Sequence, residues 1–377
     1  MEGEALFKQI ISGKKSGPLG ALARGSLLLL SKLYAYGVNK RNTAYDKGQK
    51  VSRVNAPVIS VGNITAGGTG KTPMVAYLCR ELERRGFHPA VVSRGYKAAD
   101  NKQSTVVAHN GEYRVTPSIS GDEAWLLARG LQQGSVLIGR SRVTSAELAI
   151  RELHSDVIVM DDGFQHRALH RDVDIVLIDA GNPFGYDHVL PRGLLREPLT
   201  GLTRASLLIL TKTNQVSTST LEVLRKRLQE LAPTIPLAET VHSPVGVSEL
   251  EAWAKGEALV PLQSYTDKKV WAVSGIGQPE SFVSTLKEAG YDIIGMKAFG
   301  DHHDYSRDDV FQAVTEAKAA GAEAIAVTEK DAVKLAAVLS ECKTELPIIV
   351  LAIGIQFTSN EKAVQEVLDN IKGADDQ

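Results

Sequence analysis

A glycine-rich segment between residues 62 and 72 contains the residue types that bind nucleotide phosphates. It follows the apolar run Val58–Val61 and leads directly into a stretch of helical periodicity. Strand, glycine-rich turn and helix form the context of a P-loop, in which backbone N–H groups surround phosphate oxygens. Lys71 is expected to reach the β- and γ-phosphates, and Thr72 to bind Mg²⁺. The alternative is a glycine turn without a ligand, and Thr65 stands where the eight-residue consensus has glycine. The expected phosphate-binding residues are Gly67, Gly68, Thr69, Gly70, Lys71 and Thr72.

Two adjacent acids, Asp161 and Asp162, end an apolar run and precede Gln165 and His166. Ligands bind at the carboxyl ends of strands in open α/β sheets, so these carboxylates are placed to hold Mg²⁺ directly or through water. The alternative is that they form a turn or cap a helix.

Asp122 and Glu123 precede a helical stretch. Asp122 is either the N-cap of that helix or a general base, with Glu123 as an acid near a metal. The segment Asp301–Tyr305 holds the adjacent pair His302 and His303, which could bind metal, accept protons or lie in a surface loop. No third ligand follows at the spacing that zinc requires.

Basic residues gather in three short segments. Each is either a solvated patch or, near a P-loop, a surface for an anionic substrate. These residues are Arg94 with Lys97, Arg140 with Arg142, and Arg167 with His170 and Arg171.

Apolar runs and helical stretches alternate from residue 57 onward, which predicts a mostly parallel α/β sheet. The expected strands are Pro57–Val61, Pro89–Val92, Ser135–Ile138, Asp156–Met160, Asp174–Ile178 and Ala205–Leu210, and the helices Thr72–Arg85, Asp122–Leu131, Arg142–Leu153 and Leu221–Leu231. Proline, serine and glycine interrupt the pattern over 233–269, so we expect a domain boundary near 245. A P-loop domain would occupy 46–245, and a smaller α/β domain 246–377 would close over the site. Its expected elements are strands Val270–Val273, Ile293–Ala298, Ala324–Thr328 and Ile348–Ala352, and helices Pro279–Ala289, Arg307–Ala320, Ala332–Leu339 and one from Glu361.

The first 45 residues form a separate unit with an apolar run, Pro18–Val38, surrounded by cations. Arg24 and Lys32 within this run make spanning a bilayer costly. A helix lying in a membrane interface and a helix capping a soluble core are the two interpretations. The surrounding cations are Lys8, Lys14, Lys15, Arg24, Lys32, Lys40 and Arg41.

The composition of the 377 residues is that of an ordinary globular protein of about two domains. Its formal net charge of −1 provides no basic field for nucleic acid. Two cysteines, Cys79 and Cys342, are too few for a disulfide framework, which favours a reducing cytosol. No obligate protein partner is inferred.

Taken together, the motifs resemble the tetraacyldisaccharide 4′-kinase family, which acts in the lipid A pathway of Gram-negative bacteria. The resemblance covers nearly the whole chain, including the apolar N-terminal helix. The motifs that carry it are Val61–Asn63, Gly67–Pro73, Ser93–Tyr96, Gly121–Glu123, Asp161–Arg167, Leu195–Pro198, Phe299–Tyr305 and Thr328–Ala332.

The resemblance implies a P-loop NTPase-like fold, ATP and Mg²⁺ as cofactors, and phosphorylation of an acylated disaccharide lipid at its 4′-hydroxyl. Asp122 would accept the hydroxyl proton with the help of His302, for which His303 is the alternative. It also implies a place at the cytoplasmic face of the inner membrane, and it favours the interfacial N-terminal helix. The implied metal-binding residues are Thr72, Glu123, Asp161 and Asp162, those near the transferred phosphate Gln165 and His166, and those for the anionic substrate Arg94, Tyr96, Arg140 and Arg142.

Two other functions compete with this one. A P-loop GTPase, acting as a switch or a metal-insertion chaperone, is suggested by Thr211–Asn214, which resembles a guanine-reading loop with Asn214 in place of aspartate. The second is a cytosolic kinase or ligase for a small soluble metabolite.

Overall fold

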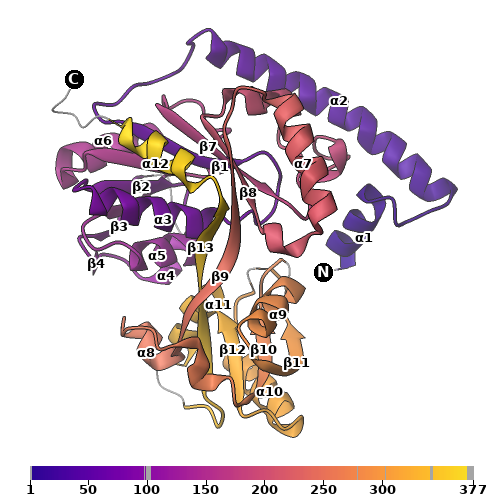
Figure 1. Ribbon diagram of the computed structural model, residues 1–377, viewed down its shortest axis with the longest axis vertical. Coiled ribbons are helices and arrows are strands. Elements are labelled where there is room, and N and C mark those ends of the chain that lie inside the picture. Colours follow the sequence, from indigo (N-terminus) through magenta and orange to yellow (C-terminus); the bar gives the residue numbers. More distant parts are fainter. Residues whose placement is uncertain are drawn as a thin grey trace.

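The computed structural model describes residues 2–96, 98, 103–277, 279–301, 303–339 and 343–371. Two lobes are joined by a pair of long strands, and two N-terminal helices lie along the outside of the first lobe (Figure 1). These helices are α1 (Glu2–Ile11) and α2 (Pro18–Asp46). No helix in the described part of the chain is both long and apolar enough to cross a membrane.

The first lobe is built on parallel strands with β1 at its centre. Val58 to Val61 of β1 pair with β6 on one side, and Ile59 to Asn63 pair with β7 on the other. Every residue of β1 is buried, because helices cover both faces of the sheet, and this explains its unbroken apolar run. The strands of this lobe are β1 (Val58–Asn63), β2 (Pro89–Ser93), β3 (Thr105–His109), β4 (Glu112–Tyr113), β5 (Ser135–Ile138), β6 (Val157–Asp161), β7 (Val173–Asp179) and β8 (Leu207–Thr211).

Amphipathic helices pack on this sheet. Met74, Val75, Leu78 and Leu82 of α3 are fully buried at helical spacing, and each such side chain contributes about 1.5–3 kcal/mol through burial. The helices are α3 (Lys71–Arg84), α4 (Pro117–Ser120), α5 (Asp122–Arg129), α6 (Arg142–Leu153) and α7 (Thr218–Leu231), with 3-10 turns at Gly185–Asp187, Leu199–Arg204 and Thr213–Gln215.

The second lobe is a smaller α/β unit with parallel pairing of β10 to β11 and to β12. A 3-10 turn at Leu262–Tyr265 precedes its first strand. Its elements are α8 (Leu250–Ala254), β10 (Lys269–Ser274), α9 (Pro279–Glu288), β11 (Asp292–Ala298), α10 (Arg307–Ala319), β12 (Ala324–Thr328) and α11 (Glu329–Val338).

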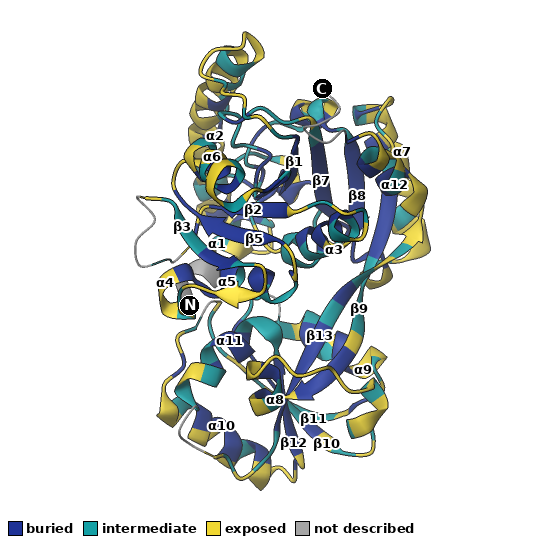
Figure 2. Cartoon of the chain, turned by 90° about the vertical axis from the view of Figure 1, so that its left-hand side faces the viewer, coloured by how far each residue is buried: buried dark blue, intermediate teal, exposed yellow. Residues whose placement is uncertain are grey.

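Two long antiparallel strands, β9 (Leu237–Glu249) and β13 (Ile348–Ser359), connect the lobes. Because β9 also pairs with β8, and β13 with β12, the described strands form one thirteen-stranded sheet. Figure 2 shows both strands running between the lobes, with buried stretches next to partly exposed ones. The strand order is β11-β10-β12-β13-β9-β8-β7-β1-β6-β2-β5-β3-β4.

The connecting strands affect the expected domain boundary. Residue 245 falls inside β9, and α12 (Glu361–Asp369) returns to the core of the first lobe through Ala363, Val364 and Leu368. Helix α5 contributes to both lobes, since Leu127 lies in the first core and Trp125 packs against the second. The division into a P-loop domain of residues 46–245 and a smaller domain of residues 246–377 stays a prediction.

The helices and strands expected on either side of residues 233–269 are all present. Their ends lie within a few residues of those expected, except that β13 continues to Ser359 where a strand ending at Ala352 is expected. The α/β fold with a mostly parallel, P-loop NTPase-like sheet is thereby confirmed. Three strands were not predicted from the sequence pattern: β3, β4 and β9. In β9 the regular pattern fails because Pro244 lies at a register shift opposite Ile353, where a strand tolerates proline.

Candidate active site

The P-loop joins the central strand β1 to α3. Gly70 is the N-cap of α3 with a left-handed φ of 87°, and no side chain caps the helix there. The N-terminal N–H groups of α3 are thus available to an anion. Lys71 Nζ lies 3.4 Å from Asn63 Oδ1 and 3.4 Å from Asp162 Oδ1. The cation that would meet the phosphates is therefore held beside the strand-end acids.

The segment at the end of β8 that resembles a guanine-reading loop, Thr211–Asn214, supports the P-loop through hydrogen bonds. Thr211 Oγ1 donates to the Thr69 carbonyl at 2.9 Å. Lys212 Nζ donates to the Gly68 carbonyl at 2.9 Å and forms an ion pair with Asp179 at 2.6 Å. Asn214 donates instead to Glu288 of α9, at 3.0 Å. In this segment, two of the side chains thus support the phosphate loop and a third contacts the second lobe.

His242 of β9 packs directly on the P-loop. A Cβ added at Gly70 would lie 2.5 Å from His242 Nε2, so only glycine fits this close approach. Nε2 is buried and has no hydrogen-bond partner among the residues that the structure describes. Burial, followed by the charge of Lys212, lowers the pKa of His242 to about 4, although Asp179 acts in the opposite direction. His242 is therefore neutral at pH 7, and nothing in the sequence pattern pointed to it.

This burial predicts a pH dependence of stability. Histidine in the unfolded chain has a pKa of about 6.5. Because the folded-state pKa is lower, the stability tied to neutral His242 is complete above pH 6.5 and is lost as the pH falls towards 4. His242→Gln should lose less stability over this interval, by on the order of 2 kcal/mol. Thermal melts of both proteins at pH 7 and pH 4.5 measure the difference, and parallel losses would contradict it.

Asp161 and Asp162 lie at the end of β6 in different environments. Asp161 accepts a hydrogen bond from Ser93 Oγ at 3.1 Å, and burial, followed by the charge of Asp162, raises its pKa to about 6. Asp162 has a left-handed φ of 51°. Arg196 Nη1 lies 2.8 Å from both of its carboxylate oxygens. Burial alone would raise the pKa of Asp162, but Lys71 and Arg196 hold it below its usual range.

Gln165 belongs to a polar network behind the P-loop. Its Nε2 donates to the Asn63 carbonyl at 2.9 Å and to Glu197 Oε1 at 3.0 Å. Glu197 is buried and also accepts from Arg204 at 2.8 Å. Burial and nearby arginines, led by Arg142, lower the pKa of His166 to about 4. The sequence indicates Arg196 and Glu197 only as members of the Leu195–Pro198 motif. Their individual roles could not be predicted, because they depend on contacts with Asp162 and Gln165, which are distant in the sequence.

The expected substrate-binding residues lie on the same edge of the sheet. Arg94 and Tyr96 follow β2 and are exposed, and Arg140 follows β5 and is exposed. Arg142, at the start of α6, is buried and donates to the Gly139 carbonyl at 3.2 Å. Burial lowers the pKa of Arg142 to about 10, although the charges of Asp161 and Asp162 oppose the shift. Of these residues, Arg142 therefore lies close enough to the strand-end acids to interact with their charges.

Helix α5 begins at Asp122 and faces the second lobe. Its N-cap is Gly121 and no side chain caps it, so the interpretation of Asp122 as an N-cap is wrong. Asp122 is buried, with Oδ2 3.7 Å from Lys334 Nζ, and Glu123 forms an ion pair with Lys330. The charge of Glu123 also contributes to the raised pKa of Asp161, which links α5 to the P-loop acids.

The expected partner of Asp122, His302, lies outside the described residues, as does Lys97. The neighbouring His303 is described. Its ring stacks on Phe299 with centroids 4.6 Å apart, and its Nε2 lies 3.2 Å from Asp309 Oδ2.

The carboxylate groups at the end of β6 are of the chemical kind that binds magnesium. Hydroxyl and carboxylate oxygens are the ligands that Mg²⁺ prefers, and a cation would offset the charge that burial penalises at Asp161. Within the described ranges, no cluster of three or more His, Cys, Asp or Glu side chains is already gathered as a metal site. Thr72 and phosphate oxygens would have to complete the coordination, as is usual for Mg²⁺.

The P-loop, the strand-end acids and the mostly parallel sheet define the class: a P-loop NTPase-like protein with a second α/β lobe. A family model described as "LpxK: Tetraacyldisaccharide-1-P 4'-kinase" matches residues 23–372. The chain belongs to this family, the tetraacyldisaccharide 4′-kinases of lipid A biosynthesis. The predicted kinase function is thereby confirmed. The two alternatives, a P-loop GTPase and a kinase or ligase for a soluble metabolite, are not supported.

Individual relatives agree with the family model. A tetraacyldisaccharide 4′-kinase of Anaeromyxobacter sp. (strain Fw109-5) is 40% identical over 335 residues, covering 88% of each chain. That of Syntrophus aciditrophicus (strain SB) is 38% identical over 353 residues, covering 92% of each chain. A crystal structure of LpxK from Aquifex aeolicus in complex with ATP superposes with a TM-score of 0.72 at 30% identity, covering 92% of this chain and 98% of that one.

Proposed function

We propose that Asp122 accepts the proton of the 4′-hydroxyl of a tetraacyldisaccharide 1-phosphate while the γ-phosphoryl group of ATP moves to that oxygen, with His302 assisting from the second lobe. The supporting observation is the position of Asp122, buried at the start of α5 and facing the second lobe. A sugar hydroxyl is a weak nucleophile, so a base within hydrogen-bond distance assists the transfer.

Gly67 to Gly70, Lys71 and Thr72 would hold the ATP phosphates, with Gln165 and His166 beside them. Thr72, Asp161, Asp162 and Glu123 would hold Mg²⁺ directly or through water. Bound Mg²⁺ would neutralise charge on the phosphates. Lys71 and Arg196 keep Asp162 ionised, which suits a metal-binding carboxylate.

Arg94, Tyr96, Arg140 and Arg142 would face the anionic disaccharide. Three of these side chains are exposed, and the fourth, Arg142, is buried and is acted on by the charges of Asp161 and Asp162. Arginine suits this role because its planar fork binds phosphate in a bidentate manner.

The experiment that tests the function compares ATP with GTP, each with and without detergent-solubilised tetraacyldisaccharide 1-phosphate. The proposal expects ADP release that requires the lipid acceptor, and a phosphate added at its 4′ position. Nucleotide hydrolysis that favours GTP and ignores the lipid would contradict it.

The substrate is a membrane lipid, and α2 is suited to bring the protein to a cytoplasmic membrane surface. Leu22, Leu29 and Leu33 are 70%, 65% and 66% exposed and lie on one face at spacings of seven and four. The opposite face is attached to the segment that carries Arg196. Ser31 Oγ donates to the Val189 carbonyl at 2.8 Å, and Tyr34 donates to the Arg196 carbonyl at 3.0 Å.

Replacing Leu22, Leu29 and Leu33 together by glutamine should weaken binding to vesicles that contain anionic lipid by at least about tenfold. The triple variant retains Ser31 and Tyr34, so the attachment of α2 to the site remains. Val223→Gln, on α7 and 66% exposed, is the matched control. Co-sedimentation measures binding, and unchanged sedimentation of the triple variant would refute the membrane role of α2.

A further inference from the structure

Two lysines of α11 extend from the second lobe to the start of α5. Lys330 and Lys334 are four residues apart and therefore share one face of α11. Lys330 forms an ion pair with Glu123, and Lys334 Nζ lies 3.7 Å from Asp122 Oδ2. Each of the two acids of α5 thus faces a cation that comes from the other lobe.

Lys334 also contacts the segment of the second lobe that contains His302. Its Nζ donates to the His303 carbonyl at 2.8 Å and lies 3.5 Å from Asp304 Oδ1. The Lys334 side chain is 17% exposed and that of Asp122 is 5% exposed. An ammonium group has three donors and no acceptor, so it can bind both oxygens at once. One side chain therefore joins the Asp122 carboxylate of α5 to the His303 carbonyl of the second lobe.

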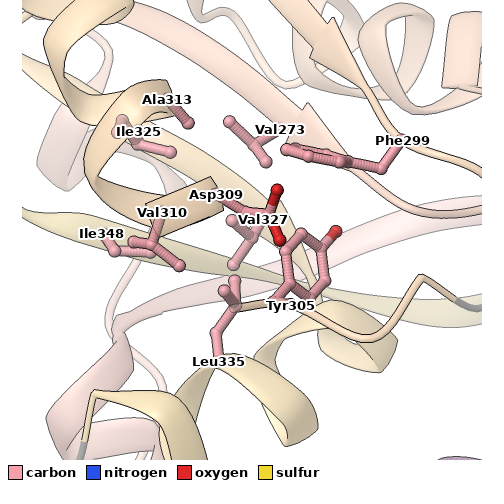
Figure 3. Close-up of a pocket in the computed structure, with 10 residues that line it drawn as sticks. All are labelled: Val273, Phe299, Tyr305, Asp309, Val310, Ala313, Ile325, Val327, Leu335 and Ile348. Atoms are coloured by element: carbon pink, nitrogen blue, oxygen red, sulfur yellow. The ribbon is translucent and has the colours of Figure 1, made fainter. Parts of the chain in front are cut away.

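This segment is fixed to the second lobe independently of Lys334. Asp331 accepts hydrogen bonds from the Gly275 amide at 3.0 Å and from Tyr305 Oη at 2.8 Å. Figure 3 shows Phe299 and Tyr305, the two ends of the segment, among the side chains that line a small and mainly aliphatic pocket of the second lobe. The His303 carbonyl consequently has a defined position relative to α11. Because Lys334 contacts both this carbonyl and Asp122, it holds the Asp122 carboxylate near the His303 carbonyl.

We propose that Lys334 is a positioning residue for phosphoryl transfer. It holds the Asp122 carboxylate at a fixed position relative to the His303 backbone, which is adjacent in sequence to His302. The inference rests on the proposed role of Asp122 as the base. A carboxylate released from this contact can rotate or move with α5, and a displacement of about 1 Å can cost about 10²-fold in rate. ATP binds on the P-loop, which Lys334 does not contact in any described interaction, so its binding should change little.

The test uses the full chain and three variants: Lys334→Met, Lys334→Arg and Lys297→Met. Lys297 is the matched control because its side chain is also 17% exposed and has a 2.8 Å ion pair, with Glu316, inside the second lobe. Lys334→Met should lower kcat by about 10²-fold with the KM for ATP changed less than about threefold. Lys334→Arg should recover part of the loss, and Lys297→Met should keep the normal rate.

A double variant separates this inference from the function on which it rests. Adding Lys334→Met to Asp122→Asn should cause little further loss, because residues that act as a unit are not additive. A normal rate in Asp122→Asn alone would refute the base assignment and so remove the premise of the inference. A large loss in Asp122→Asn with a normal rate in Lys334→Met would overturn the role of Lys334 only. Multiplied losses, or a kcat loss in Lys334→Met no larger than in Lys297→Met, would overturn it too. If Lys334→Met does not fold, Lys334→Gln takes its place, and a normal kcat in Lys334→Gln would overturn the positioning role.

Discussion

Replacing Lys71 by alanine is expected to lower kcat by about 10³-fold with the fold intact. Lys71 is the first residue of α3, and the buried side chains that hold this helix lie from Met74 onward. Asp162 would keep its contact with Arg196, so the end of β6 should retain its structure. The loss would therefore come from the missing charge at the transferred phosphate.

The control for Lys71→Ala is Arg84→Ala at the other end of the same helix. Arg84 is 73% exposed and pairs only locally, with Glu81, in the described contacts. Steady-state turnover and circular dichroism of both variants separate a catalytic effect from a structural one. Near-normal ATP-dependent transfer in Lys71→Ala would remove the P-loop assignment.

Asp122→Asn is expected to lower kcat by about 10²- to 10⁴-fold with little change in ATP affinity. Asparagine keeps the size of the side chain but cannot accept the hydroxyl proton. Because Gly121 is the N-cap of α5, the change should not produce the loss of about 1 kcal/mol that a missing cap causes. Turnover and thermal melts measured together test this expectation.

Asp308→Asn provides the control for Asp122→Asn, because Asp308 is an exposed acid in the first turn of α10. Its rate should be normal. A lowered melting temperature with the rate preserved in Asp122→Asn would contradict the assignment of Asp122 as a base.

The sequence was sufficient to predict the features that depend on short stretches of chain. The strand, glycine turn and helix around Lys71 are contiguous, and so are β6 and its two acids. The basic segments that contain Arg94 and Arg142 follow two predicted strands, but the sequence left two interpretations open for them, a solvated patch and a surface for an anionic substrate. The unbroken apolar pattern of these strands also follows from burial on both faces.

The residues that support the site could not be predicted in the same way. His242 packs on Gly70, and Lys334 approaches Asp122, across more than 150 residues of sequence. Such contacts depend on β9 and β13, and the pattern of β9 is interrupted by Pro244 at a register shift. A buried histidine or an interlobe lysine has no periodicity of its own, so only the fold reveals its partner.

A proton-accepting pair formed across the two lobes is tested most directly by single-turnover transfer in Asp122→Asn, His302→Ala and the double variant, each saturated with ATP. If the two residues act as one unit, each single change should slow the transfer strongly, and the double variant should be scarcely slower than the slower single variant. Losses that multiply in the double variant, or a normal rate in either single variant, would contradict the pair.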